Sequence, residues 1–151
     1  MKKILYLVLP ILFLMCFSSC DKNDAKEPKY KYDLFDEPCL NWGESQSLVC
    51  NWMIEHGFQV KENTEGIITY QANKQAKEMI QRFDDGLSIT FVYINSKVTS
   101  ETDINGYLSE RYVFIKDEED AKEYTTTDNK TTIIFYESIE DGVYTIVYQK
   151  R

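Results

Sequence analysis

The sequence predicts an α+β fold in which two helices pack on one antiparallel sheet. Two segments carry apolar residues at helical spacing, and two Asp-Gly pairs each separate runs in which apolar and polar residues alternate. The order of helix, strands and hairpin occurs twice along the chain. We therefore expect a tandem repeat of helix plus antiparallel strands, and a length of 151 residues is typical of a single domain.

The first predicted helix begins after Ser45, because serine commonly caps a helix N-terminus. Four residues then follow the i, i+3, i+4, i+7 spacing of one helical face: Val49, Trp52, Met53 and His56. Gly57 is expected to end the helix, since glycine readily adopts the left-handed conformation of a C-terminal cap.

Strands are predicted between residues 58 and 94. Apolar and polar residues alternate over 58–61, a turn follows at 63–66, and a strand is expected at 67–70. Residues 77–83 and 87–94 flank Asp84-Asp85-Gly86, which is a strong hairpin signal. In the second arm both faces are at least partly apolar. One face holds Leu87, Ile89, Phe91 and Tyr93, and the other holds Thr90, Val92 and Ile94.

The second half of the chain begins with a predicted helix over residues 99–112. Ser100 and Asp103 have the spacing of a capping box, whereas Gly106 is unfavourable within a helix. Residues 112–115 are strand-like, and the charged residues 116–130 are expected to form a long hairpin or loop. Strands at 131–138 and 143–150 flank Asp141-Gly142, a second hairpin signal.

The two halves align as repeat units 40–95 and 96–151. A shift of 56 residues places Asp85-Gly86 over Asp141-Gly142. Identities are few, so the shared order of elements is the better evidence. The alternative is one α+β domain that contains two similar helix-hairpin pieces.

Residues 1–19 have the features of a secretory signal peptide. Two lysines precede an apolar run that ends at Phe17, and the small residues Ser18 and Ser19 follow. The run has fewer than the roughly 20 residues that a membrane-spanning helix needs. The chain is therefore expected to be exported, with this segment removed.

Phe17-Ser18-Ser19-Cys20 resembles a bacterial lipobox, with Phe17 where that family prefers leucine. The resemblance implies cleavage before Cys20 and acylation of Cys20, which would anchor the mature chain in a membrane. The alternative is an ordinary signal peptide without lipid attachment.

With Cys20 acylated, residues 20–31 would form a lipidated tether, because they are polar, charged and unable to bury a core. Residues 32–151 would form the folded domain.

Asp21 and Asp24 resemble the acidic export tags of surface lipoproteins in Bacteroidetes. That resemblance implies an outer-membrane lipoprotein of the cell envelope that is displayed at the cell surface. A position facing the periplasm is the alternative.

Four residues match the W-G-x-S-x-x-x-V opening of small Bacteroidetes lipoproteins: Trp42, Gly43, Ser45 and Val49. A Gly-x-Ser sequence before a helix and strands is also similar to the small outer-membrane-assembly lipoproteins. Duplicated, that unit resembles the β-lactamase inhibitor protein architecture, although the second unit here has no Trp-Gly opening. The resemblance implies a fold rather than an activity.

Composition and motifs exclude several function classes. With 25 acidic and 17 basic residues the net charge is −8, which disfavours nucleic acid as a partner. His56 is the single histidine, which excludes metal sites built from several histidines and disfavours a His-based triad. We expect no cofactor, no metal site and no catalytic residues. The acidic groups are expected to lie in turns and loops: Asp84, Asp85, residues 117–120, Glu137, Glu140 and Asp141.

Cys39 and Cys50 remain once Cys16 is removed with the signal and Cys20 is acylated. Two cysteines eleven positions apart in an oxidising compartment can form a disulfide that closes a small loop. The alternative is a pair of separate buried thiols, because free cysteine is often a core residue.

Tyrosines suggest the function. Tyrosine is favoured at interfaces because its ring is apolar and its hydroxyl is polar. Four are candidates for a binding surface: Tyr107, Tyr112, Tyr144 and Tyr148. We expect a lipid-anchored, non-enzymatic module that binds a protein partner through a sheet face or hairpin loops. A glycan-binding surface lipoprotein is the alternative, and a small carboxylate-dependent hydrolase is a second alternative.

Overall fold

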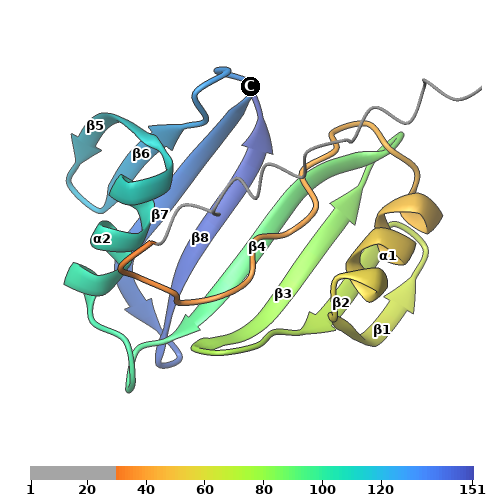
Figure 1. Cartoon of the computed structure of the whole chain (residues 1–151), viewed down its shortest axis with the longest axis horizontal. Coiled ribbons are helices and arrows are strands. Elements are labelled where there is room, and N and C mark those ends of the chain that lie inside the picture. Colours follow the sequence, from red (N-terminus) through yellow and green to blue (C-terminus); the bar gives the residue numbers. More distant parts are fainter. Residues whose placement is uncertain (1–29) are drawn as a thin grey trace, which may run out of the picture.

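One antiparallel sheet of eight strands dominates the structure (Figure 1). The computed structural model of the protein describes residues 30–151, apart from the side chains of residues 138–140. The strand order is β1-β2-β3-β4-β8-β7-β6-β5. The elements are α1 (Gln46–Glu55), β1 (Gln59–Thr64), β2 (Ile67–Gln71), β3 (Ala76–Phe83), β4 (Leu87–Asn95), α2 (Glu101–Arg111), β5 (Val113–Glu118), β6 (Ala121–Thr125), β7 (Thr131–Glu140) and β8 (Val143–Lys150).

The predicted signal peptide 1–19, the lipidation site Cys20 and the tether as far as residue 29 lie outside the described residues. Neither α1 nor α2, the two helices of residues 30–151, is long and apolar enough to cross a membrane.

The expected α+β fold with two helices packed on one sheet is wrong, because the chain is much richer in strand. Strand residues outnumber helical residues more than twofold, and the helices have only 10 and 11 residues. Residues 116–130 were expected as a long hairpin or loop, and they form the first of these alternatives and add to the strand content. There β5 continues to Glu118 and pairs with β6. Charged side chains suit an exposed edge strand, so the charge run did not exclude strand structure.

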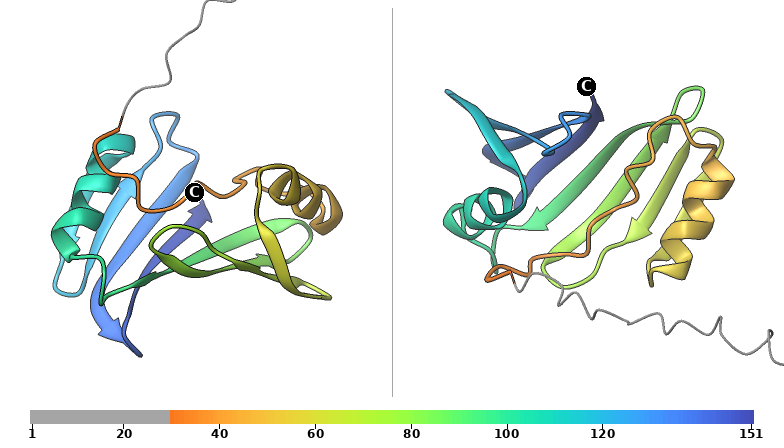
Figure 2. Two further views of the ribbon diagram at one scale, coloured as in Figure 1. Left: turned by 60° about the horizontal axis from the view of Figure 1, so that its bottom comes forward. Right: turned by 45° about the horizontal axis from the view of Figure 1, so that its top comes forward.

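The sheet consists of two four-stranded meanders, each preceded by one helix. They join where β4 pairs with β8, from Ile89↔Gln149 to Asn95↔Val143. The helices lie on the same face of the sheet but far apart, α1 near β1 and β2 and α2 near β5 and β6 (Figures 1 and 2). We call this side of the sheet the covered face. The two helices do not cover its centre, so another part of the chain must do so.

Residues 30–44, here called the strap, fill that space between the two helices (Figures 1 and 2). Leu34, Phe35 and Cys39 are buried at 3% exposure or less. The strap is also bonded to loops at the strand ends, where Gly43 N–H donates to the Leu87 carbonyl at 3.0 Å and Leu87 N–H donates to the Glu44 carbonyl at 2.8 Å. No helix or strand was expected before Ser45, yet this segment supplies part of the core.

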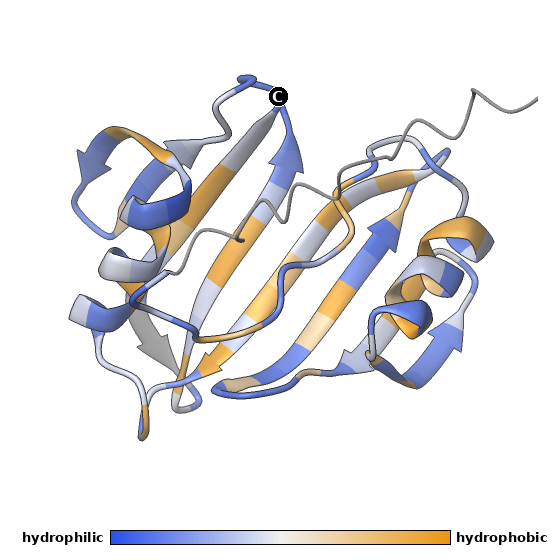
Figure 3. Cartoon of the chain, viewed as in Figure 1, coloured by the Kyte–Doolittle hydropathy of each residue, from blue (hydrophilic) through white to orange (hydrophobic). Residues whose placement is uncertain are grey.

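Residues on the covered face form rows that run across the strands. One row joins Tyr70, Met79, Val92, Ile146 and Phe135 on five adjacent strands, and all five are fully buried. Figure 3 shows the alternation of apolar and polar residues along the central strands. The period of two places one set of side chains on the covered face and the other on the opposite face.

Candidate functional site

The tyrosines that we expected at a binding surface do not form one. Tyr107 and Tyr148 are fully buried, Tyr144 is 8% exposed, and Tyr112 is half-buried. They lie on the covered face or on α2, beneath or beside the strap. A ligand therefore has no access to a flat tyrosine surface, and this expectation is wrong.

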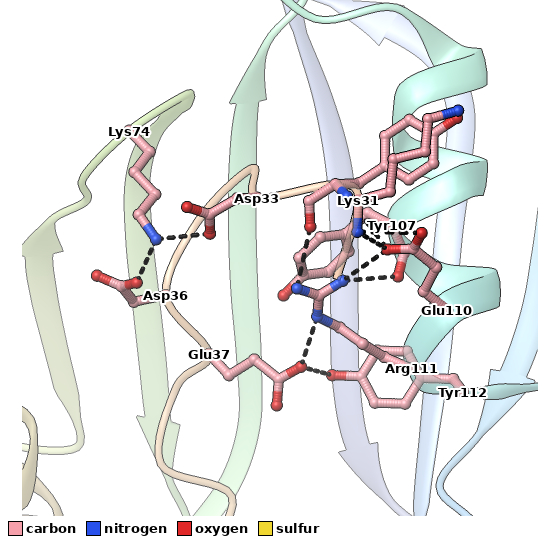
Figure 4. Close-up of polar contacts among 10 residues, drawn as sticks. Lys31, Asp33, Asp36, Glu37, Lys74, Tyr107, Glu110, Arg111 and Tyr112 are labelled. Carbon is pink, nitrogen blue, oxygen red and sulfur yellow. Dashed lines mark hydrogen bonds and ion pairs between the residues drawn. The ribbon is translucent and has the colours of Figure 1, made fainter. Parts of the chain in front are cut away.

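Arg111, the last residue of α2, holds the first part of the strap (Figure 4). Its guanidinium carbon lies 3.9 Å from the ring centroid of Tyr30 and 3.9 Å from that of Tyr107. Nη2 donates to the Tyr32 carbonyl at 3.0 Å, and Nε lies 3.3 Å from Oε1 of Glu37. The Arg111 side chain is only 9% exposed, so its hydrogen bond to the Tyr32 carbonyl is shielded from water, whereas Glu37 is 46% exposed and solvent partly screens that ion pair.

Two carboxylates complete this cluster, here called the Arg111 clamp. Glu110 accepts hydrogen bonds from the backbone N–H groups of Lys31 at 3.0 Å and Tyr32 at 3.1 Å. Glu37 accepts one from the Tyr112 hydroxyl at 3.1 Å (Figure 4). The predicted tether ends where the strap begins, so the clamp lies at the point where the tether would join the folded domain.

A second, weaker contact fixes the middle of the strap. Lys74 Nζ lies 2.6 Å from Oδ1 of Asp33 and 2.7 Å from Oδ1 of Asp36 (Figure 4). The backbone N–H of Asp36 donates to Oδ1 of Asn73 at 3.2 Å. Both carboxylates are more than a third exposed, so solvent screens these ion pairs and each contributes little to stability.

Burial of the phenol groups beside the clamp changes their acidity. Burial raises the pKa of Tyr107, Tyr112 and Tyr148. The nearby charge of Glu37 acts in the same direction on all three groups. The phenol groups of these tyrosines are therefore neutral over the physiological range.

Cys39 and Cys50 are free, buried thiols in the structure, and they do not form the disulfide that was one of two alternatives. Cys39 lies in the strap and Cys50 in α1, and both belong to the core. Burial raises the pKa of the Cys39 thiol, which lowers its reactivity.

The candidate acidic residues whose side chains the structure describes lie in separate parts of the fold. Asp84 and Asp85 lie in the β3–β4 turn, residues 117–120 in the β5–β6 hairpin and Asp141 in the β7–β8 turn. Glu137 forms an ion pair with Lys122. The part of the chain that the structure describes has no group of three or more potential metal ligands. The described carboxylates at these turns therefore do not form the pair across a cleft that a glycosidase uses.

The face of the sheet opposite the strap is covered by no helix or loop of the described chain (Figure 2). A row of apolar residues, here called the open-face row, crosses the four central strands on this face. It joins Ile80, Phe91, Val147 and Ile134, of which Val147 is 7% exposed and the other three are half-buried. Tyr93 stacks beside Phe91 with ring centroids 6.4 Å apart and an interplanar angle of 8°. An antiparallel sheet usually turns a polar face to solvent, so an apolar row here is a candidate contact surface.

The sequence contained the signal for this surface. Ile89, Phe91 and Tyr93 alternate with Thr90, Val92 and Ile94, so that both faces of β4 are apolar. The alternation indicates that both faces of the sheet at β4 are apolar. It does not indicate which face is buried beneath other segments of the same chain. The structure does, because Val92 and Ile94 are fully buried whereas Phe91 and Tyr93 are partly exposed.

The edge strands differ in character. On β5, Val113, Phe114 and Ile115 are 47%, 52% and 42% exposed. On β1 every side chain is also exposed, but five of its six residues are polar or charged. Polar and charged residues protect an edge from unwanted pairing, so β5 is the less protected edge.

No family model, no curated protein and no solved structure matches the chain. The function must therefore be inferred from the residues and their geometry.

Proposed function

We propose that the protein is a lipid-anchored lipoprotein of the cell envelope that acts as a non-enzymatic, protein-binding module. The observation that carries the proposal is the open-face row, an apolar stripe on a sheet face that the described chain leaves uncovered. Interface centres are enriched in aromatic and apolar residues and carry a polar rim. Here Phe91 and Tyr93 supply the aromatic centre.

Polar residues border the row on the same face, as the cross-strand pairs require. Arg82 pairs with Ile89, Glu78 pairs with Tyr93, and Glu123 pairs with Ile134. A rim of mixed charge gives a partner orientation as well as contact area. The buried tyrosines on the covered face take no part in this surface, so the glycan-binding alternative on those residues has no support.

The membrane anchor rests on the lipobox resemblance at Cys20. An acylated Cys20 and a tether would hold the domain near the membrane, and the Arg111 clamp would fix the first residues of the strap to α2. The open-face row lies on the opposite side of the sheet from the strap, so the anchor would leave it accessible.

Site-specific photocrosslinking tests the binding surface. A photoreactive phenylalanine analogue replaces Phe91 in the full-length protein expressed in its own cells, and a matched control places it at Ile54, an exposed residue of α1. We expect a discrete crosslinked protein from position 91 and none from position 54. Equal patterns at both positions would overturn the proposal, as would the absence of any crosslinked protein at position 91.

Metabolic labelling with an alkyne fatty acid tests the anchor. We expect labelling of the full-length protein and its loss in Cys20→Ala, with transfer of the variant out of the membrane fraction. Labelling that persists in Cys20→Ala would show that the anchor is elsewhere. This result is independent of the crosslinking result, so the two parts of the proposal can fail separately.

A further inference from the structure

A pocket of about 330 Å³ lies on the strap side of the sheet, near the end of β8. Six residues line it: Leu40, Trp42, Asn129, Lys130, Lys150 and Arg151. The first two belong to the strap, and the others belong to the β6–β7 loop and the end of the chain as printed. Its volume is in the range of small-molecule sites.

The charge of this pocket is opposite to that of the protein. Three of its six lining residues are cationic, whereas the whole chain has a net charge of −8. Among the described residues, Lys150 forms no ion pair, and Lys130 has only a 3.5 Å contact between its Nζ and Oδ2 of Asp128. Cations that are not neutralised by carboxylates are available to an anionic ligand.

The apolar wall of the pocket is held in a defined position. Trp42 is half-buried, and its Nε1 donates to Oγ1 of Thr131 at 2.9 Å. Thr131 is itself buried at 4% exposure, so the indole is attached to a rigid strand. Arg151 is also constrained, because its backbone N–H donates to the Lys130 carbonyl at 3.0 Å and its guanidinium donates to Asn129. A wall that is already ordered loses little entropy when a ligand binds.

We propose that this pocket binds an acidic sugar, that is, a pyranose ring that carries a carboxylate or a phosphate group. The lysines and Arg151 would bind the acid group, and Nδ2 of Asn129 would donate to a hydroxyl group, since its Oδ1 already accepts from Arg151 and Thr125. Trp42 and Leu40 would contact the apolar C–H face of the ring. The proposal concerns a different surface from the open-face row and does not depend on it.

Tryptophan fluorescence measures this binding directly. The protein has two tryptophans, so in Trp52→Phe the emission reports on Trp42 alone. The full-length variant in detergent micelles is titrated at low salt with glucuronate, glucose 6-phosphate, glucose and acetate. We expect a saturable change with at least one of the two acidic sugars, and none with glucose or acetate at the same concentrations. Whichever acidic sugar binds identifies the acid group.

Charge variants give the second measurement. In Lys130→Gln and in Lys150→Gln we expect the dissociation constant to rise about tenfold, since each loses a charge-assisted hydrogen bond. Lys97→Gln is the matched control, because Lys97 is exposed and lies beyond the opposite end of β8, where Ser96 N–H donates to the Gly142 carbonyl. Failure of both acidic sugars to saturate, an equal effect of acetate, or equal loss of affinity in Lys97→Gln would overturn the proposal.

Discussion

The aromatic ring of Tyr32 lies directly against Gly106 of α2. A Cβ atom on Gly106 would lie 2.4 Å from Cε2 and 2.5 Å from Cζ of Tyr32, closer than non-bonded atoms approach. Glycine within a helix costs about 1 kcal/mol relative to alanine. The structure accounts for that cost, because the missing side chain allows the strap to pack on the helix.

A double-mutant cycle tests this contact. Gly106→Ala alone should stabilise the protein by less than helix propensity predicts, or destabilise it, because the new methyl group displaces the Tyr32 ring. In a Tyr32→Ala background the same change should be stabilising by about 1 kcal/mol. Urea unfolding of the four proteins gives the coupling free energy, which we expect to be unfavourable by about 1 kcal/mol. Additive effects would show that the ring does not constrain position 106.

The Arg111 clamp should be a major source of strap stability. Arg111→Ala removes a nearly buried cation together with its hydrogen bond to the Tyr32 carbonyl and its contacts with the Tyr30 and Tyr107 rings, so we expect a loss of about 1–3 kcal/mol in urea unfolding. Arg111→Lys should recover only part of the loss, because an ammonium group does not reproduce the planar guanidinium contacts. Arg82→Ala, at an exposed position of β3, is the control and should change stability by no more than about 0.5 kcal/mol. Equal effects at 82 and 111 would contradict the clamp.

The two helix N-caps should differ in value, although both are serines. The Ser100 side chain accepts from Asp103 N–H at 3.2 Å and completes a capping box, whereas Ser45 makes no side-chain cap bond. Ser100→Ala should therefore cost about 1 kcal/mol, and Ser45→Ala less than about 0.5 kcal/mol. Thermal unfolding of the two variants makes the comparison, and an equal loss in both would contradict it.

Local signals in the sequence were sufficient for most elements. Ser100 and Asp103 marked the start of α2, and the Asp-Gly pairs marked two of the hairpins, because caps and turns are determined by residues close in sequence. The strap has neither a helix cap, nor a hairpin signal, nor a regular spacing of apolar residues. Leu34, Phe35 and Cys39 are buried because distant strands need cover, and that requirement is set by the tertiary structure.

Local sequence patterns could not predict the candidate sites either, because these sites also depend on tertiary structure. Tyrosine is common at interfaces, but Tyr107 and Tyr148 are buried. Their burial depends on the strap, whose position could not be predicted from the periodicity of the sequence. The pocket at Trp42 joins the strap to residues 129–151, more than 80 positions later in the chain. A spacing argument cannot find a site whose residues meet only through strand pairing.

The thiols of Cys39 and Cys50 should be protected in the native protein. Cys39 is 3% and Cys50 8% exposed, and burial raises the pKa of the Cys39 thiol. Iodoacetamide should alkylate both at least about tenfold more slowly in the native state than in denaturant. Mass spectrometry of the peptides that contain each residue measures the extent of labelling. If either residue reacts in denaturant only after a reductant is added, the pair forms a disulfide in the native protein, which contradicts two free thiols.

Stability should decrease in alkaline solution because of the buried tyrosines. A phenol is neutral when protonated, and burial raises the pKa of Tyr107, Tyr112 and Tyr148 in the folded state. Above the ordinary tyrosine pKa of about 10, the unfolded chain loses these protons while the folded chain keeps them. The stabilisation is therefore fully present below about pH 10 and is lost as the pH rises toward the folded-state values, by up to about 1.4 kcal/mol per pH unit for each group.

Urea unfolding between about pH 8 and about pH 11, a range that spans the ordinary tyrosine pKa, measures how steeply the unfolding free energy falls with pH. Tyr148→Phe removes one buried ionisable group, so its unfolding free energy should fall less steeply with pH than that of the parent protein. Tyr136→Phe is the matched control, because Tyr136 is 40% exposed on the opposite face of the sheet and its loss should leave the slope unchanged. If the slope is the same in all three proteins, lysine deprotonation rather than the buried phenols causes the alkaline loss of stability. A flat profile up to the highest pH would mean that these phenols reach solvent in the native state, and that the strap does not seal the covered face.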